Sequence, residues 1–169
     1  QAGPAGLRER ITRGEWVVAL RSRKVFAAGH VPGAVNFDLD GPFINYLAWM
    51  IPWGTPVTLL GSTPEQVHAA HRELVRVGID NAVGQAAGGP EAWLEDPAAA
   101  QRLEQVDFHG VAAALAGGRD VWLLDTRQVL EWESGHIDGA VFMPFYEVAD
   151  RLSEIPRDKP VYVYCGSGY

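Results

Sequence analysis

The feature of this 169-residue sequence that most constrains its fold is an internal repeat. The pattern R-x8-H-x-x-G-A begins at Arg21 and again at Arg127, and its histidines are His30 and His136. Both the arginines and the histidines lie 106 positions apart, while the Pro-Val pairs that follow each copy lie 104 positions apart. Because a repeated pattern marks a repeated structural unit, the sequence predicts two tandem units of similar architecture.

Continuous apolar runs indicate the strands of each unit. Such runs occupy residues 16–20 and 56–60 in the first unit, and residues 121–124 and 161–164 in the second. None of them alternates polar and apolar side chains, which is typical of strands covered on both faces of a parallel sheet. Residues 81–84 are a candidate for one further strand in the first unit.

Helix signals separate these runs. Residues 5–14 and 108–116 are predicted to form short helices that end at glycines. A third helix begins with Thr63 as N-cap, Pro64 as first helical residue and Gln66 as capping-box partner. The expected apolar face and final glycine of this helix are Val67, Ala70, Leu74, Val77 and Gly78. Alternating strands and helices predict an α/β fold, in which each unit has a parallel sheet flanked by helices.

The repeat also sets the predicted domain boundaries. We expect a first domain over residues 1–94, a polar, alanine-rich linker or connecting helix over residues 95–106, and a second domain over residues 107–169. Compared with the first copy, the second lacks about thirty residues, roughly a third of a small domain. We therefore expect the second domain to be incomplete at its C-terminus. The start at Gln1, without a methionine, leads us to expect a longer parent chain.

Composition narrows the class of protein. The formal charge of −7 and the isoelectric point near 5.1 argue against nucleic acid and anionic membrane surfaces as partners. The most apolar window, residues 43–53, is too short to span a bilayer and is interrupted by Pro52. Cys165 is the only cysteine, so no internal disulfide can form, and we expect a reducing compartment, the cytoplasm.

The final residues hold the candidate nucleophile. An apolar run leads into Cys165, and Gly166, Ser167, Gly168 and Tyr169 follow it. Glycines allow consecutive backbone N–H groups to turn inward, and such a nest favours a thiolate and anything anionic bound to it. The alternative from the residues alone is an inert core thiol, because cysteine is among the most buried residue types.

These motifs together resemble a known family. The stretch D-T-R-x-x-x-E-W-x-x-G-H-I-x-G-A from Asp125 to Ala140, followed by V-Y-V-Y-C-G-S-G-Y, resembles a rhodanese (sulfurtransferase) domain. The first copy, beginning at Ala19, resembles a degenerate rhodanese domain. The tandem arrangement and the stretch over residues 49–53 are similar to the C-terminal part of certain bacterial fusions. In those, a metallo-β-lactamase-fold hydrolase, often of the persulfide dioxygenase type, precedes two rhodanese units.

The resemblance implies a site and a reaction. Cys165 matches the family's nucleophile, which takes a sulfane sulfur from thiosulfate or a persulfide and passes it to an acceptor thiol. The loop whose amides cradle that sulfur matches Gly166, Ser167, Gly168 and Tyr169. Neither a metal nor an organic cofactor is implied. The family loop continues into an arginine and a helix, and both would lie beyond Tyr169, so the second domain is expected to be truncated at its active-site loop.

The first copy departs from this pattern. Aligning the two Pro-Val pairs places Gly61 where Cys165 stands, and Ala19 takes the place of Asp125. A glycine cannot act as a nucleophile, so we expect the first unit to be structural or a docking surface.

Several residues have structural interpretations beside functional ones. Asp125 and Arg127 are expected to form an ion pair that holds the local structure in place, rather than to take part in catalysis. His136 is expected to fix a turn, because His30 recurs in the copy without a cysteine. The function of residues 43–53 stays open, because this stretch could contact an upstream domain or cover the first unit's own core. His68 and His71, which could bind a metal, are expected to lie on a solvated helix face instead.

The leading interpretation of the chain is therefore a sulfurtransferase that works through a persulfide on Cys165. Its expected partners are a small sulfur donor, an acceptor thiol and an upstream metallo-β-lactamase-fold domain. The first alternative is a non-catalytic tandem module that docks to or serves such a hydrolase. A phosphatase is a weaker alternative, because G-S-G-Y after the cysteine is closer to the sulfurtransferase loop.

Overall fold

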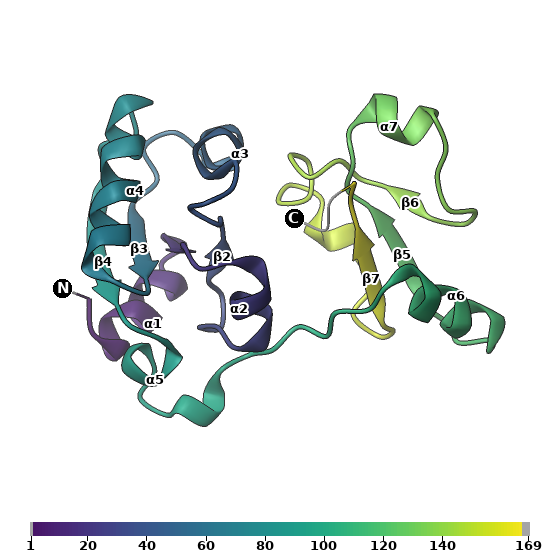
Figure 1. Ribbon diagram of the computed structural model, residues 1–169, viewed down its shortest axis with the longest axis horizontal. Helices are drawn as coiled ribbons and strands as arrows, with labels where there is room; N and C mark the ends of the chain where they lie inside the picture. The colour runs from purple at the N-terminus through teal and green to yellow at the C-terminus, as the bar shows by residue number, and fades with distance from the viewer. Residues whose placement is uncertain (1, 167–169) are drawn as a thin grey trace. The chain divides into compact units, whose positions relative to one another are not determined.

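The computed structural model describes residues 2–166 of the chain. It divides into two compact units, residues 1–104 and residues 105–169, and each has its own parallel sheet. The predicted fold class, α/β with parallel sheets flanked by helices, is confirmed (Figure 1). No helix among the described residues is long and apolar enough to cross a membrane.

The first unit contains a four-stranded sheet in the order β2-β1-β3-β4, with every neighbouring pair parallel (Figure 1). Its strands are β1 (Trp16–Ala19), β2 (Val35–Asn36), β3 (Val57–Gly61) and β4 (Ala82–Ala87). The predicted strands are confirmed, and β4 is longer than the predicted residues 81–84. Strand β3 is buried at all of its positions, as its continuous apolar sequence predicts.

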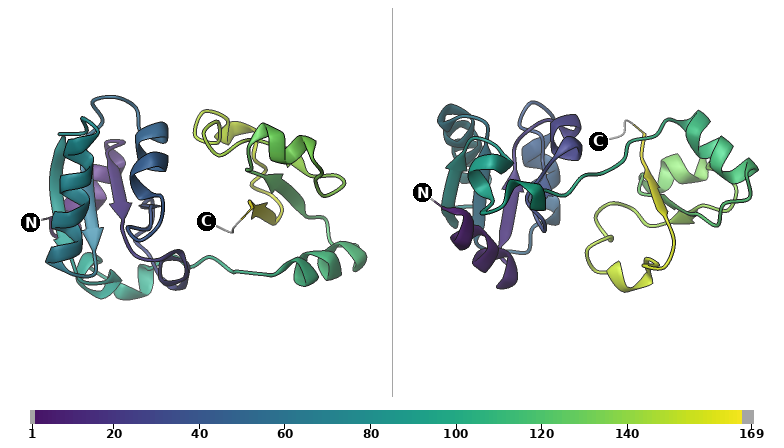
Figure 2. Two further views of the ribbon diagram at one scale, coloured as in Figure 1. Left: turned by 45° about the horizontal axis from the view of Figure 1, so that its top comes forward. Right: turned by 90° about the horizontal axis from the view of Figure 1, so that it is seen from below.

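Helices cover both faces of this sheet, which makes three layers (Figure 2). The helices are α1 (Pro4–Thr12), α2 (Arg23–Ala28), α3 (Phe43–Met50), α4 (Pro64–Arg76) and α5 (Pro90–Trp93). On one face, α3 and α4 pack against Val18 and Leu20. On the other, Leu7 of α1 and Trp93 of α5 pack against Val17. Successive strand residues thus face opposite layers, as the pleat requires.

Helix α4 begins and ends as predicted. The N-cap Thr63 accepts a hydrogen bond from the Gln66 N–H, and Gly78, with φ +81°, follows the end of the helix. The Gln66 side chain accepts a bond from the Ser62 N–H at 2.8 Å, one residue before the expected partner. The buried face consists of Val67, Ala70 and Leu74. Including Val77 in that face was wrong, since it lies past the last helical residue and is 39% exposed.

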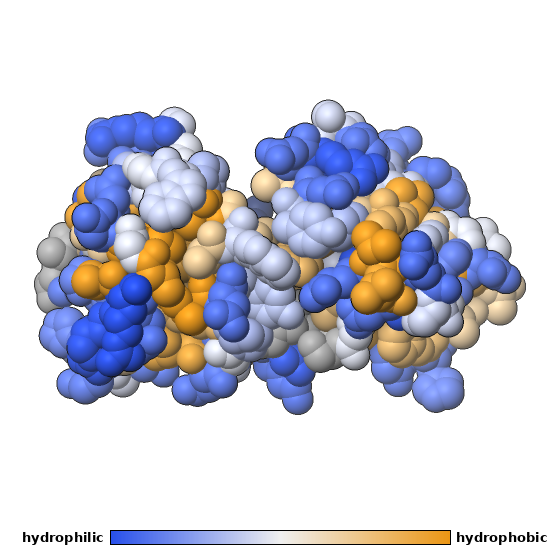
Figure 3. All heavy atoms as spheres, turned by 90° about the horizontal axis from the view of Figure 1, so that it is seen from above, coloured by the Kyte–Doolittle hydropathy of each residue, from blue (hydrophilic) through white to orange (hydrophobic). Residues whose placement is uncertain are grey.

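The aromatic stretch over residues 43–53 forms α3 and the turn after it. One side of it, Phe43, Leu47 and Ile51, is buried in the core of the first unit. On its other side, Trp49 and Trp53 are exposed, Trp53 by 88%. This stretch therefore covers the unit's own core, and its role as a contact for another domain stays a prediction. Apolar side chains reach the surface of both units, as the orange areas in Figure 3 show.

The segment after α5 has no α-helix. Residues 97–99 form the 3-10 turn η1 (Pro97–Ala99), and Gln101 then pairs with His30 in an isolated antiparallel bridge. The Leu103 N–H donates to the Ala27 carbonyl at 2.9 Å. Part of the expected linker thus contacts the first unit, and the alternative of a connecting helix was wrong. The boundaries at residues 94 and 107 stay predictions.

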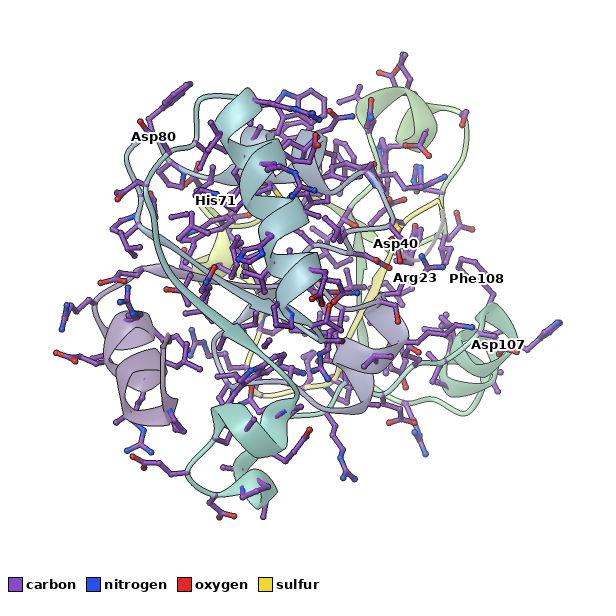
Figure 4. All side chains as sticks on the ribbon, turned by 60° about the vertical axis from the view of Figure 1, so that its left-hand side comes forward. Arg23, Asp40, His71, Asp80, Asp107 and Phe108 are labelled. Atoms are coloured by element: carbon purple, nitrogen blue, oxygen red, sulfur yellow. The ribbon has the colours of Figure 1, made fainter. Side chains whose placement is uncertain are left out.

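The second unit repeats the first sheet with the order β6-β5-β7, again all parallel. Its elements are α6 (Phe108–Ala116), β5 (Trp122–Asp125), α7 (Val129–Glu133), β6 (Val141–Phe142), η2 (Leu152–Glu154) and β7 (Val161–Tyr164). The predicted helix α6 is confirmed; Figure 4 labels Asp107 and Phe108 at its start. The Asp107 carboxylate caps it by accepting the Gly110 N–H at 2.8 Å.

Strand pairing confirms the alignment of the two copies. Trp16 pairs with Val57 in the first sheet, and Trp122 pairs with Val161 in the second. These pairs differ by the same 106 and 104 positions as the sequence repeat. Cys165, directly after β7, therefore corresponds to the last residue of β3, Gly61, as the aligned Pro-Val pairs predict.

Candidate functional site

The candidate nucleophile lies at the carboxyl end of β7, next to the central strand β5 of the second sheet. Cys165 directly follows β7, which pairs with β5, and its side chain is partly exposed. Gly166 is the one predicted loop residue within the described part of the chain, and it is exposed. The other predicted loop residues, Ser167, Gly168 and Tyr169, lie outside the described residues. The carboxyl edge of a parallel sheet is where α/β proteins commonly bind ligands.

A buried ion pair stands at the end of β5, beside Cys165's strand. Asp125 is fully buried, and the Arg127 Nε lies 3.0 Å from each carboxylate oxygen, with Nη2 at 2.7 Å from Oδ2. The Arg127 backbone N–H also donates to Oδ1 at 2.9 Å. Nη2 of the same guanidinium donates to the Gly135 carbonyl at 2.8 Å. The expected pair is thus present, and it ties the strand end to the turn before His136.

The charges of this pair are set by opposing effects. Burial acts to raise the pKa of Asp125, but hydrogen bonds from the Arg127 side chain and backbone and from Tyr164 outweigh it, so the pKa is lowered. The pKa of Tyr164 is raised, chiefly by burial and also by the Asp125 carboxylate. Asp125 is therefore ionised and Tyr164 neutral at pH 7. A carboxylate held this way suits a scaffold better than a general base.

Thr126 and Tyr164 fix the backbone that leads into Cys165. Both the N–H and the hydroxyl of Thr126 donate to the Tyr164 carbonyl, at 3.0 and 3.1 Å. The Tyr164 hydroxyl accepts the Ile137 N–H at 3.3 Å, and the Arg127 guanidinium lies over the Tyr164 ring at 5.6 Å. Sequence reasoning assigned no role to Thr126, because its partner lies 38 positions away along the chain.

His136 closes a turn on α7. Its Nδ1 lies 3.1 Å from the Trp132 carbonyl oxygen, and its ring stacks on the Trp132 ring with centroids 3.4 Å apart. In the first unit, His30 makes the same contacts with Phe26, at 3.0 Å for the hydrogen bond and 4.0 Å between centroids. Since both units use the histidine in this way, the geometry fits the predicted turn-fixing role.

A carboxylate that sequence reasoning did not assign lies against the loop. Glu131 Oε2 accepts the Gln128 N–H at 3.1 Å, within the capping box of α7. Its other oxygen, Oε1, is 2.9 Å from where a β-carbon on Gly166 would stand. The only sequence signal for this proximity is that Glu131 lies within the rhodanese-like stretch from Asp125 to Ala140, whereas the aligned residue of the first copy is Val25.

The corresponding place in the first unit is filled. A β-carbon on Gly61 would lie 2.8 Å from Val67 Cγ2 and 3.2 Å from the Thr63 carbonyl oxygen. Contacts under 3.0 Å require a neighbour to move, and the packed Val67 and the backbone resist that. The adjacent amide of Ser62 is already bonded to the Gln66 side chain. This loop therefore lacks the room for a thiol, and one of its amides is already taken by a side chain.

The paired arginine of the first unit has lost its carboxylate. Arg21 Nη2 donates to the Gly29 carbonyl at 2.6 Å, which matches the bond from Arg127 to Gly135. Ala19 replaces the acidic residue, and Arg21 Nε is buried without a hydrogen-bond partner among the described residues. Burial lowers the pKa of Arg21, and its guanidinium lies over the Trp93 ring at 5.0 Å.

The described residues include no group of three or more metal-ligating side chains. His68 and His71 lie on the exposed face of α4, where Figure 4 labels His71, and they have the solvated setting that was predicted. That the activity of this chain needs no metal stays a prediction.

Comparisons with known proteins agree with this geometry. The profile of the rhodanese-like domain family matches residues 4–96 and residues 107–169. The chain is 36% identical over 66 residues to a sulfurtransferase from Allochromatium vinosum, covering 39% of this chain and 62% of that protein. It is 42% identical over 46 residues to the HTH-type transcriptional regulator Rv0324 from Mycobacterium tuberculosis, covering 27% of this chain and 20% of that protein. The chain thus spans less than two thirds of these relatives.

Solved structures show the same fold. The anaerobic ergothioneine biosynthesis enzyme from Chlorobium limicola, in complex with trimethyl histidine, superimposes with a TM-score of 0.50 at 22% identity. The match covers 83% of this chain and 40% of that enzyme. With one family match in each of its two units, the chain belongs to the rhodanese-like domain family.

Proposed function

We propose that the second unit is a sulfurtransferase whose nucleophile is Cys165. The observation that carries this proposal is the position of the thiol: it directly follows β7, at the carboxyl edge of the sheet, and is partly exposed. The corresponding residue of the first unit is Gly61, and a side chain there would meet the packed core. The family membership and the sulfurtransferase relative support the same assignment.

The proposed reaction has two displacements at sulfur. The Cys165 thiolate attacks the outer sulfur of thiosulfate or of a persulfide. A new S–S bond forms, the old one breaks, and sulfite or the donor's thiolate leaves with the electron pair. An acceptor thiolate then attacks the outer sulfur of the cysteine persulfide, and the Cys165 thiolate leaves. No net oxidant or reductant is consumed, and the chemistry needs neither a metal nor an organic cofactor.

Residues around the thiol have supporting roles in this proposal. Asp125 and Arg127 hold the strand end and the turn before His136, and Thr126 fixes the carbonyl that precedes Cys165. The amides from Gly166 to Tyr169 would bind the anionic sulfur species, because inward-facing N–H groups stabilise negative charge. Removing one such donor from an enzyme site typically slows the reaction about a hundredfold or more.

The partners follow from this chemistry. We infer that the chain meets a small sulfur donor and an acceptor thiol in the cytoplasm, and that a metallo-β-lactamase-fold domain precedes it in a longer chain. A strongly acidic chain with a formal charge of −7 is unsuited to nucleic acid or anionic membranes.

The second candidate is a non-catalytic tandem module that docks to or serves such a hydrolase. It is favoured by the exposed Trp53 and by the groove that Trp53, Pro52 and Ile79 line in the first unit. Aromatic side chains are enriched at protein interfaces. In this case the first unit would be the docking element, since its own loop is filled.

Mass spectrometry tests the enzyme against the module. The protein is incubated with thiosulfate, and a form extended past Tyr169 is compared with the 169-residue chain. We expect a gain of one sulfur, about 32 Da, on Cys165 of the extended form, and its loss on adding cyanide. Cys165→Ser is the control and should gain nothing. No gain in either form, with thiosulfate or with cysteine persulfide, would refute the sulfurtransferase and leave the module.

A further inference from the structure

We propose that the first unit binds a small monocarboxylate, of the size of formate, beside Arg21 at the carboxyl end of β1. The ligand takes the place that the Asp125 side chain has in the second unit. This inference concerns the unit without a cysteine, and it does not depend on the proposed reaction of Cys165.

Arg21 carries a buried positive charge with an unused donor. The residue is only 8% exposed, and its Nε has no hydrogen-bond partner among the described residues. Its Nη2 donates to the Gly29 carbonyl at 2.6 Å, which holds the guanidinium in place. Burial lowers the pKa of Arg21, and the charge of Glu91 acts in the opposite direction. A buried charge is costly unless it is paired, and carboxylates are strong acceptors for a guanidinium.

The second unit shows what the same arginine atoms bind. There the Nε of Arg127 lies 3.0 Å from both carboxylate oxygens of Asp125, and Nη2 lies 2.7 Å from Oδ2. This Nη2 also donates to the Gly135 carbonyl at 2.8 Å, as that of Arg21 does to Gly29. One arginine can therefore hold its turn and bind a carboxylate at the same time.

The backbone brings Ala19 to the position of Asp125. Ala19 is the last residue of β1, and Asp125 is the last residue of β5. Two positions before Ala19, Val17 belongs to the same buried cluster as Trp93. Since every second residue of a strand faces the same side, the buried Ala19 side chain faces this layer as well. Alanine differs from aspartate by one carboxyl group, which a formate-sized ligand supplies.

Trp93 brings a second buried donor to this layer. The Arg21 guanidinium lies over the Trp93 ring at 5.0 Å. The π-face of the ring attracts the positive charge, but this contact gives neither side chain a hydrogen-bond acceptor. Within the described part of the chain, three buried side-chain polar atoms have no partner, and two of them are Arg21 Nε and Trp93 Nε1. A carboxylate accepts several hydrogen bonds and is therefore suited to this pair of donors.

The small size of the ligand limits its affinity. Formate has few non-hydrogen atoms, so even an optimal site binds it with a Kd of about 1 mM. We expect a Kd of about 10 mM, because both the anion and the donors lose contact with water on binding. At this Kd, about 100 mM formate lowers the equilibrium constant for unfolding about tenfold, since the ligand binds only the folded form.

The first test measures the stability of the first unit in the 169-residue chain by urea titration. Sodium formate at about 100 mM should lower the unfolding equilibrium constant about tenfold relative to the same concentration of sodium chloride. Ala19→Asp supplies its own carboxylate, so formate should stabilise this variant no more than chloride does. The matched control is Ala5→Asp, which adds the same charge at an exposed position and should keep the wild-type response.

A second test does not depend on whether Ala19→Asp folds. The indole N–H resonance of Trp93 is followed by NMR in the wild-type chain while formate is added. Because this N–H is a buried donor at the proposed site, its resonance should shift and saturate with a Kd of about 10 mM. Sodium chloride at the same concentrations should produce no saturable shift.

Three outcomes would overturn the inference. No saturable shift of the Trp93 resonance, or no gain in stability beyond that of chloride, would mean that a carboxylate does not meet these donors. An equal gain in Ala19→Asp would show that formate binds elsewhere. A gain in Glu91→Gln but not in the wild type would show that the Glu91 carboxylate already takes this place. None of these outcomes bears on the proposed sulfurtransferase, because none involves Cys165.

Discussion

Replacing Asp125 with alanine tests how much the buried ion pair stabilises the second unit. The variant would reproduce the situation of the first unit, where Ala19 stands beside Arg21 and the arginine Nε is buried without a partner among the described residues. Arg127 would retain its bond to the Gly135 carbonyl, as Arg21 retains its bond to Gly29. What is lost is the carboxylate that anchors this arginine to the end of β5.

The magnitude follows from the burial of the two partners. Asp125 is fully buried and accepts three side-chain bonds and one backbone bond from Arg127. Removing one member of a buried ion pair costs about 3–5 kcal/mol, because the remaining charge is left uncompensated. The Arg127 side chain is 17% exposed and can reach water. We therefore expect the lower end of the range, a loss of about 3 kcal/mol.

The loss should depend on pH. The folded-state pKa of Asp125 lies below its unfolded value of about 3.9. The ionised carboxylate therefore stabilises the folded state above that unfolded value, and this contribution disappears as the pH falls through the folded pKa. The difference in unfolding free energy between the wild type and Asp125→Ala should be full at pH 7 and should shrink below about pH 4.

Urea titrations followed by tryptophan fluorescence would measure this difference for the transition of the second unit. Asp120→Ala is the control, because it removes a salt bridge to Lys159 from a surface position that is 78% exposed, and it should change the midpoint little. A loss below about 1 kcal/mol for Asp125→Ala at pH 7, or an equal loss at pH 7 and pH 3, would refute the reasoning.

Two further predictions concern the first unit. Gly61→Cys should destabilise this unit by about 1–3 kcal/mol, since its β-carbon would lie 2.8 Å from Val67 Cγ2, and it should not create a second persulfide site. The urea midpoint measures the loss of stability, and the mass after thiosulfate treatment shows whether a second sulfur is added, which would contradict the prediction. Leu47→Ala should cost about 2–5 kcal/mol of unfolding free energy, because this residue of α3 is fully buried. Trp53 is 88% exposed, so Trp53→Ala should change the unfolding free energy by no more than about 0.5 kcal/mol in the same titration. A similar loss for both variants would contradict the described burial of Leu47 and exposure of Trp53.

Local sequence determined much of the fold. The repeat predicted two units, and the strand pairing of each reproduces its spacing of 106 and 104 positions. Helix α4 could be predicted because its signals are local: an N-cap at Thr63, a proline at the first position and a glycine after the end. Helices α2 and α7 were not predicted, since each has six residues or fewer and thus too few turns for a periodic apolar face.

Part of the candidate site could likewise be predicted from the sequence, and part of it could not. Cys165, Asp125 and Arg127 could be named from the motif, because the ion pair joins residues only two positions apart and the thiol follows a recognisable strand. The position of the Glu131 carboxylate near Gly166 could not be predicted, since these residues lie 35 positions apart along the chain.

The sequence by itself thus determined the two units, the longer strands and the position of the thiol, because these leave apolar runs and a repeated spacing in the sequence. The two-residue strands β2 and β6 were not predicted. Only the tertiary structure decided which of the two loops has room for a side chain and which carboxylate lies beside the thiol. At Gly61, Val67 and the Thr63 carbonyl fill the space. Beside Gly166, the Glu131 carboxylate approaches from α7. Both outcomes depend on how the elements pack together, and that packing is set by the whole fold of each unit.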